Sequence, residues 1–209
     1  MAEVADPKDP PQIYLIVTDG PGWTSDGLAA ALDAVPVGCV RLETASRDEA
    51  EISQWADAYR EVCHARDVAV VLAEHAALAV RLGLDGVHMM GTKDLRDARE
   101  AVGRDAILGT FCGASRHAGL NAGEIGADYV SFGPVSDTGL GTGDVLDEEV
   151  FSWWCDVVEV PVVAEGGLTP DRIETLAPFV EFFAIGPEIS QSDDRPRALA
   201  DLHRIATGA

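Results

Sequence analysis

Residues 160–189, VPVVAEGGLTPDRIETLAPFVEFFAIGPEI, decide the fold of this chain. The stretch holds two short apolar runs, at 160–164 and 182–185, whose β-branched and aromatic residues suit strands buried on both faces. Each run is followed by glycine, a Gly-Gly pair at 166–167 after the first and Gly186 after the second. The pattern therefore predicts two consecutive units in which a buried strand ends in a glycine turn.

The two glycine turns are candidates for binding phosphate. Thr169 is a suitable N-cap and Pro170 suits the first position of a helix, so a helix is predicted directly after Gly166 and Gly167. Glycine tolerates positive φ and lets bare N–H groups approach a ligand, and phosphate commonly binds where such a turn opens a helix. The alternative is a pair of ordinary turns between strand and helix. We expect Gly166, Gly167 and Gly186 to contact a phosphate group.

The preceding chain repeats the same alternation at a short, regular step. Apolar strand-like runs alternate with segments of helical periodicity, which predicts a parallel sheet because parallel neighbours need crossover connections. The predicted strands are 13–17, 39–42, 68–72, 86–90, 107–111 and 129–132, followed by the two named above. The predicted helices are 24–34, 52–63, 76–82, 95–102, 118–125, 147–158, the segment from 170, and 195–206. Eight equal units favour an α/β fold closed as a (β/α)8 TIM barrel over an open α/β sheet.

Length and composition bound the organisation and the partners. The 209 residues predict a single barrel domain over 13–209, preceded by a polar, Pro-rich and disordered segment at 1–12 without a signal peptide. The net charge of -21 argues against a nucleic-acid partner and against an anionic membrane surface. Four cysteines without C-x-x-C spacing, and no apolar run of about 18 residues, favour reduced thiols and a cytoplasmic protein.

The residues at the ends of the predicted strands are mostly acidic. In a barrel these residues share one mouth, and Glu43, Glu74 and Glu165 each end or follow an apolar run. Clustered carboxylates raise one another's pKa, so one can act as a general acid or base, and two or three that converge can bind Mg²⁺. The strand period of two leaves the direction of each side chain open.

Two further polar residues lie inside predicted strands. Arg41 needs a partner if it is buried, and Glu43 lies two residues away on the same face, so a structural ion pair and a ligand contact are both open. His88 lies within an apolar run, where a satisfied barrel-lining histidine is favoured over a catalytic one.

Several segments together resemble the thiamine phosphate synthase family, which includes the thiazole tautomerases. The segments are IYLIVTD (13–19), LGLDGVHMM (82–90), ILGTF (107–111), GADYVSFGPVSDT (126–138), VPVVAEGGLTPDRIETL (160–176) and FFAIGPEI (182–189). They cover nearly the whole chain in the expected order. The resemblance implies a (β/α)8 barrel that joins hydroxymethylpyrimidine pyrophosphate to a thiazole phosphate, releasing pyrophosphate with Mg²⁺.

The chain departs from the family pattern where the pyrophosphate is expected. The family's Gln-x-Arg-x-Lys on strand 2 corresponds to the stretch from Arg41 to Ala45, so a carboxylate, Glu43, replaces the Arg and alanine replaces the Lys. The Lys of the Thr-x-Thr-Lys loop after strand 6 is also missing from the stretch that begins at Thr138. After strand 5, where the tautomerases have a histidine, the chain has Cys112, and His117 is the nearest histidine.

The strand-end residues and the resemblance together give a set of predicted site residues. We predict catalytic roles for Arg41, Glu43, Glu74 and Lys93, phosphate contacts for Gly166, Gly167, Gly186 and Thr138, and a Mg²⁺ site at Glu74 and Asp94. Three hypotheses follow: a synthase, a degenerate barrel that binds a phosphorylated or thiamine-like ligand, and a divergent enzyme acting on another small phosphate ester with Glu43 or Glu74 as base. A homo-oligomer also stays open, because the Trp153-Trp154 pair suits either an interface or the core.

Overall fold

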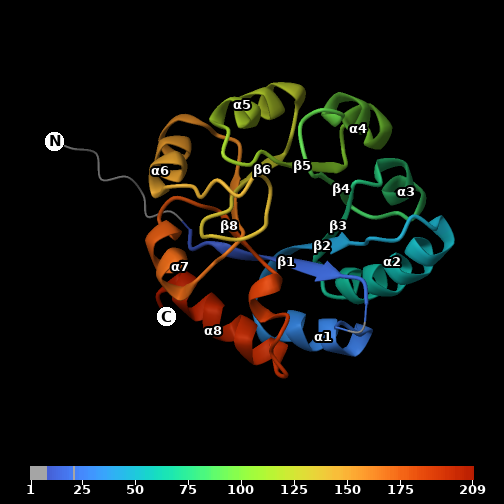
Figure 1. Cartoon of the computed structure of the whole chain (residues 1–209). Coiled ribbons are helices and arrows are strands. Elements are labelled where there is room, and N and C mark those ends of the chain that lie inside the picture. Colours follow the sequence, from blue (N-terminus) through green and yellow to red (C-terminus); the bar gives the residue numbers. More distant parts are fainter. Residues whose placement is uncertain (1–8, 21) are drawn as a thin grey trace.

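The computed structural model describes residues 9–20 and 22–209, and these residues form a closed parallel barrel of eight strands in sequence order, surrounded by helices (Figure 1). The prediction of a (β/α)8 TIM barrel is confirmed. Of the predicted disordered segment 1–12, residues 1–8 lie outside the described part of the chain, and the first strand already begins at Gln12.

The strands and helices alternate without interruption. The strands are β1 (Gln12–Thr18), β2 (Val37–Glu43), β3 (Ala69–Ala73), β4 (Gly86–Met89), β5 (Ile107–Phe111), β6 (Tyr129–Phe132), β7 (Val162–Glu165) and β8 (Phe182–Ile185). The helices are α1 (Ser25–Ala34), α2 (Glu49–His64), α3 (Ala76–Arg81), α4 (Leu95–Val102), α5 (Arg116–Ile125), α6 (Glu148–Val157), α7 (Pro170–Leu176) and α8 (Arg195–Thr207), with a short 3-10 helix η1 (Pro187–Ile189) after β8.

Differences from the predicted bounds have local causes. Helix α5 begins before the predicted residue 118 because the Ser115 side chain caps it by accepting a hydrogen bond from the N–H of Ala118 at 3.1 Å. Strand β7 begins at Val162 rather than at 160, and it ends one residue later than predicted, at Glu165. Its last residue therefore belongs to the pleat, which fixes the direction of the Glu165 side chain.

The strand pleat separates two apolar regions. The larger cluster lies between the sheet and the helices, and a smaller cluster fills the inside of the barrel. The members of the inner cluster are Tyr14, Ile16, Cys39, Val71, Tyr129, Val163 and Ala184. Gly109 leaves room for one of its rings, because a Cβ added there would lie 1.9 Å from the Tyr129 ring. The barrel interior is thus a packed core with a mouth at one end.

The predicted helix after the first glycine turn is confirmed. The side chain of Thr169 accepts a hydrogen bond from the N–H of Arg172 at 3.3 Å, and Pro170 occupies the first turn of α7. Gly166 and Gly167 have φ values of 82° and 77°, in the left-handed region that glycine adopts most readily.

The loop 133–145 packs over this glycine turn. The N–H of Val135 donates to the carbonyl of Gly166 at 2.8 Å, and a Cβ added at Gly167 would lie 2.9 Å from Cγ2 of Thr138. The close approach explains why glycine is needed at position 167. It also fixes Thr138 and the residues after it above the mouth of the barrel.

The tryptophan pair on α6 belongs to the core. Trp154 is buried and donates its indole N–H to the carbonyl of Val160 at 2.7 Å, while Trp153 is partly buried and lies 5.0 Å from the Arg116 guanidinium. The pair therefore gives no support to the predicted homo-oligomer, which stays a prediction. Within residues 9–20 and 22–209, no helix is both long and apolar enough to cross a membrane.

Candidate active site at the mouth of the barrel

A cavity of about 560 Å³ opens at the C-terminal ends of β1, β2, β7 and β8. This volume lies within the range of about 300–1,000 Å³ that small-molecule sites occupy. The charged side chains that line it are Arg41, Glu43 and Glu165, and loop residues from Thr138 to Leu140 cover one side. Trp23 and the turn after β8 line the cavity as well.

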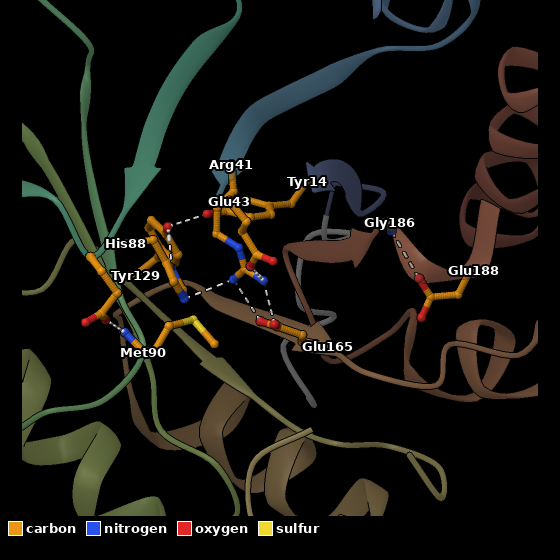
Figure 2. A network of polar contacts seen from close by, with 10 residues as sticks. Tyr14, Arg41, Glu43, His88, Met90, Tyr129, Glu165, Gly186 and Glu188 are labelled. Carbon is orange, nitrogen blue, oxygen red and sulfur yellow. Dashed lines mark hydrogen bonds and ion pairs between the residues drawn. The ribbon is translucent and has the colours of Figure 1, made fainter. Parts of the chain in front are cut away.

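Arg41 projects from β2 into the base of this cavity and is paired with two carboxylates (Figure 2). Its Nη2 lies 2.6 Å from Oε1 of Glu165 and its Nη1 donates to Oε2 of the same residue at 3.1 Å, which makes a bidentate pair. The Arg41 Nη2 also lies 2.8 Å from Oε1 of Glu43. Arg41 and Glu165 are almost fully buried, with 1% and 3% of their side chains exposed. The predicted Arg41–Glu43 ion pair is therefore present, and Glu165 is the stronger partner.

Behind Arg41, a chain of hydrogen bonds runs through the barrel interior. The Arg41 Nη1 lies 2.9 Å from Nε2 of His88, and Nδ1 of His88 lies 2.9 Å from the hydroxyl of Tyr129. The Tyr129 hydroxyl in turn lies 2.6 Å from that of Tyr14. Because a guanidinium can only donate, Nε2 of His88 must accept, and the neutral ring carries its proton on Nδ1 and donates to Tyr129.

The pKa shifts of the residues in this hydrogen-bond network agree with that proton assignment. Burial, with a further contribution from the Arg41 charge, lowers the pKa of His88 well below its usual value, so the imidazole is neutral. Burial likewise raises the pKa of Tyr14 and of Tyr129 well above that of a free phenol. The hydrogen-bond network therefore holds the Arg41 guanidinium in place without adding a charge. His88 is the satisfied barrel-lining histidine that its sequence context favours.

Glu43 is the partly exposed carboxylate of the cluster, with 29% of its side chain accessible. Burial raises its pKa, and the neighbouring Glu165 raises it further, while Arg41 acts in the opposite direction. A carboxylate with a raised pKa at the wall of a cavity can exchange a proton with a ligand. Glu43 therefore lies at the cavity wall with a raised pKa, and its role as a general acid or base stays a prediction.

Comparisons with known proteins identify the family of this chain. A protein-family model described as thiamine monophosphate synthase matches residues 13–185. The thiamine-phosphate synthase of Rhodospirillum centenum is 39% identical over 204 residues, which cover 94% of this chain and 98% of that protein. The corresponding protein of Erythrobacter litoralis is 37% identical over 212 residues, covering 97% and 99%. This chain belongs to the thiamine monophosphate synthase family.

A solved structure gives the same fold independently. The thiamine phosphate pyrophosphorylase from Pyrococcus furiosus superposes with a TM-score of 0.82, covering 93% of this chain and 95% of that one, at 23% sequence identity. At that identity the similarity establishes the shared barrel alone. The chemistry of this member of the thiamine monophosphate synthase family has to come from its own side chains.

The structure places the predicted catalytic and metal-binding residues in two groups. Arg41 and Glu43 lie together in the cavity, whereas Glu74, Lys93 and Asp94 are exposed residues after β3 and β4 that do not line it. A carboxylate oxygen of Glu74 accepts a hydrogen bond from the N–H of Met90, a residue that does line the cavity. Glu74 thus ties the turns after β3 and β4 together at the rim. Its role as a base or metal ligand stays a prediction.

The predicted phosphate contacts all line the cavity, but one donor already has a partner. Gly166, Gly167, Gly186 and Thr138 are all among the cavity's lining residues. The N–H of Gly186, however, donates to Oε2 of Glu188 at 3.1 Å (Figure 2). A ligand phosphate would have to compete with that carboxylate for the Gly186 N–H.

Sequence reasoning did not assign roles to Glu165, Tyr14 and Tyr129. Glu165 was recognisable as a carboxylate at a strand end, but only the closed barrel brings β7 close enough to β2 for Glu165 to meet Arg41. The two tyrosines lie in strands whose described residues are buried on both faces, so the sequence gives no local signal for the inner face, and only the pleat of the closed barrel brings the two side chains together there.

Proposed function

We propose that this chain is a thiamine phosphate synthase, which joins hydroxymethylpyrimidine pyrophosphate to thiazole phosphate and releases pyrophosphate. The observation that carries the proposal is the cavity at the C-terminal mouth of a barrel that matches synthases along nearly its whole length. Its position is where enzymes of this fold hold their substrates, and its volume suits a molecule of two small rings.

Glu43 and Glu165 would stabilise the positive charge of the reaction. In the condensation the C–O bond to pyrophosphate breaks, pyrophosphate leaves with the electron pair, and the thiazole nitrogen forms the new C–N bond. Positive charge develops on the pyrimidine methylene group and ends on the thiazolium ring. Two carboxylates against the single Arg41 guanidinium leave the base of the cavity with an excess of negative charge, which favours that cation.

The leaving pyrophosphate would be held at the rim after β3 and β4. Lys93 is exposed there, and Glu74 and Asp94 supply oxygen ligands of the kind that Mg²⁺ prefers. Within the described residues, no three His, Cys, Asp or Glu side chains converge to hold a metal ion by themselves. This donor set fits Mg²⁺, which commonly takes one or two carboxylates from the protein and its other ligands from substrate phosphates and water. Mg²⁺ bound by Glu74 and Asp94 would neutralise charge on the pyrophosphate.

The other features of the chain suit this setting. The net charge of -21 disfavours nucleic acid as a partner, so a small phosphate ester is the proposed ligand. The thiols of Cys39, Cys63 and Cys112 are free and buried, as is common for cysteines in a reducing cytoplasm.

A turnover assay tests the proposal. The purified protein is incubated with hydroxymethylpyrimidine pyrophosphate, thiazole phosphate and Mg²⁺, and both thiamine phosphate and pyrophosphate are quantified. We expect the two products in equal amounts, with formation abolished when either substrate is omitted. Absence of both products from folded protein would overturn the proposal.

The charge of the cavity favours one alternative function. Arg41 is the cation among the described residues that line the cavity, and it is neutralised by two carboxylates, so these residues leave no free positive charge for a pyrophosphate. A barrel that binds a thiamine-like cation without turnover fits this arrangement. Saturable binding of thiamine phosphate, in a protein that forms no product from the two substrates, would favour this alternative over the synthase.

A further inference from the structure

The carboxylate of Glu188 joins the two glycine turns at the mouth of the barrel. Its Oε2 accepts the N–H of Gly186 at 3.1 Å, after β8, and its Oε1 accepts the N–H of Leu168 at 3.2 Å, after β7. One side chain therefore occupies backbone donors from both turns at once. Figure 2 shows it beside Gly186, on the opposite side of Glu165 from Arg41.

One of these two donors, the N–H of Gly186, lines the cavity, and the other, the N–H of Leu168, lies next to it. Leu168 directly follows Gly167, which also lines the cavity. Backbone N–H groups in such turns attract anions, and a carboxylate satisfies them in the same way as two phosphate oxygens would. Pro187, between Gly186 and Glu188, has no N–H to offer in replacement.

We propose that Glu188 is a specificity-determining residue, whose carboxylate competes with the phosphate group of the thiazole substrate for the N–H groups of Gly186 and Leu168. A phosphate ester can use these donors only when the carboxylate leaves them, and a carboxylate that stays nearby repels the phosphate. A thiazole alcohol does not meet this competition because it is neutral. The carboxylate of Glu188 therefore weakens the binding of the phosphorylated thiazole and leaves the binding of the alcohol with the same ring unaffected.

The side chain of Glu188 is suited to such competition because it is only partly buried. Solvent can take over its hydrogen bonds when it leaves the two donors, so displacement does not require a charge to be left in the core. This inference rests on the proposed function in one respect, since it takes the thiazole ring as the ligand. The competition for the N–H groups applies to inorganic phosphate as well.

Binding measurements on Glu188→Ala and Glu188→Gln test the proposal. Thiazole phosphate, the thiazole alcohol and inorganic phosphate are each titrated calorimetrically into wild-type protein and both variants, without the pyrimidine substrate. For Glu188→Ala we expect the Kd of thiazole phosphate to fall at least about tenfold, while that of the alcohol changes by less than about twofold. Glu188→Gln keeps one acceptor without the charge and should lie between wild type and Glu188→Ala.

The control is Glu174→Ala, which removes the same charge from an exposed position on α7. It should leave all three dissociation constants unchanged, which separates the local competition from the net charge of the protein. Circular dichroism and thermal melting show whether each variant is folded. Loss of the fold in both Glu188 variants would show that the carboxylate is required for folding and would overturn the proposal.

The outcomes separate this inference from the proposed synthase. Tighter binding of inorganic phosphate and thiazole phosphate by Glu188→Ala, in a protein without turnover, would support the competition and refute the synthase. Turnover by the protein, with unchanged phosphate affinity in both Glu188 variants, would support the synthase and refute the competition. An equal gain for the alcohol and the phosphate ester would show a steric effect, and it would also overturn the proposal.

Discussion

Substitution of Glu165 by alanine should destabilise the protein strongly, because it breaks a buried ion pair from one side. The change removes both hydrogen bonds from Arg41 to Glu165, at 2.6 and 3.1 Å, and leaves a guanidinium whose side chain is 1% exposed. Removing one partner of a buried pair costs about 3–5 kcal/mol of the free energy of unfolding. Because Glu43 remains 2.8 Å from Arg41, we expect the lower end, about 3 kcal/mol.

Urea denaturation followed by fluorescence and circular dichroism measures this loss, with linear extrapolation to water. For a chain of this size, about 3 kcal/mol corresponds to a fall in Tm of about 6–12 °C. The control is Arg204→Ala, because the Arg204–Asp201 pair is exposed on α8 and its two atoms lie 2.7 Å apart. An exposed pair contributes about 0–1 kcal/mol, so that control should barely move the transition.

A double variant distinguishes the effect of a buried, unpaired charge from that of lost packing. Arg41→Met combined with Glu165→Leu replaces the pair by apolar groups, and Glu43 can hydrate because 29% of its side chain is exposed. The double variant should therefore be more stable than Glu165→Ala. The reasoning is refuted if Glu165→Ala costs less than about 1 kcal/mol, or if the double variant is the less stable of the two.

Three further predictions concern other parts of the barrel. Burial raises the pKa of Glu43 in the folded protein above the usual glutamate value of 4.5, so the folded state keeps that proton to higher pH than the unfolded chain does. Wild type should therefore lose stability relative to Glu43→Gln as pH rises through the window above 4.5. Denaturation curves at several pH values measure this, and an unchanged difference between the two proteins would contradict it. Gly109→Ala places a Cβ 1.9 Å from the Tyr129 ring and should cost about 1–3 kcal/mol in urea denaturation, whereas Gly91→Ala, where no atom lies within 4 Å, should be close to neutral. Burial raises the pKa of Cys63 and Cys112 to about 12 and that of Cys39 further. A thiol reagent at pH 8 should therefore label these three cysteines slowly in the native protein and rapidly in urea. Mass spectrometry locates the labelled residues, and fast labelling of the native protein would contradict their burial.

The sequence by itself determined the number and order of the β/α units. Strand and helix signals are local: apolar runs bounded by glycine, and caps such as Thr169, act within a few residues of chain. The sequence also indicated that Arg41 and Glu43 share a face, because residues two apart on a strand point the same way. Errors at element ends, such as the start of β7, arise where pairing with neighbouring strands decides the boundary.

Only the tertiary structure decided which side chains meet inside the barrel. In the closed sheet Arg41 contacts Glu165, which is 124 residues away in the sequence, and His88, which is 47 residues away. No periodicity within one strand encodes contacts between residues so far apart in the sequence. The same holds for Glu188, whose acceptor role depends on two turns being adjacent in space. Conversely, Lys93 and Asp94 follow a strand end as expected, yet both are exposed and neither lines the cavity. Local pattern thus specifies the elements of this protein, whereas barrel closure selects the partners that set the charge of its site.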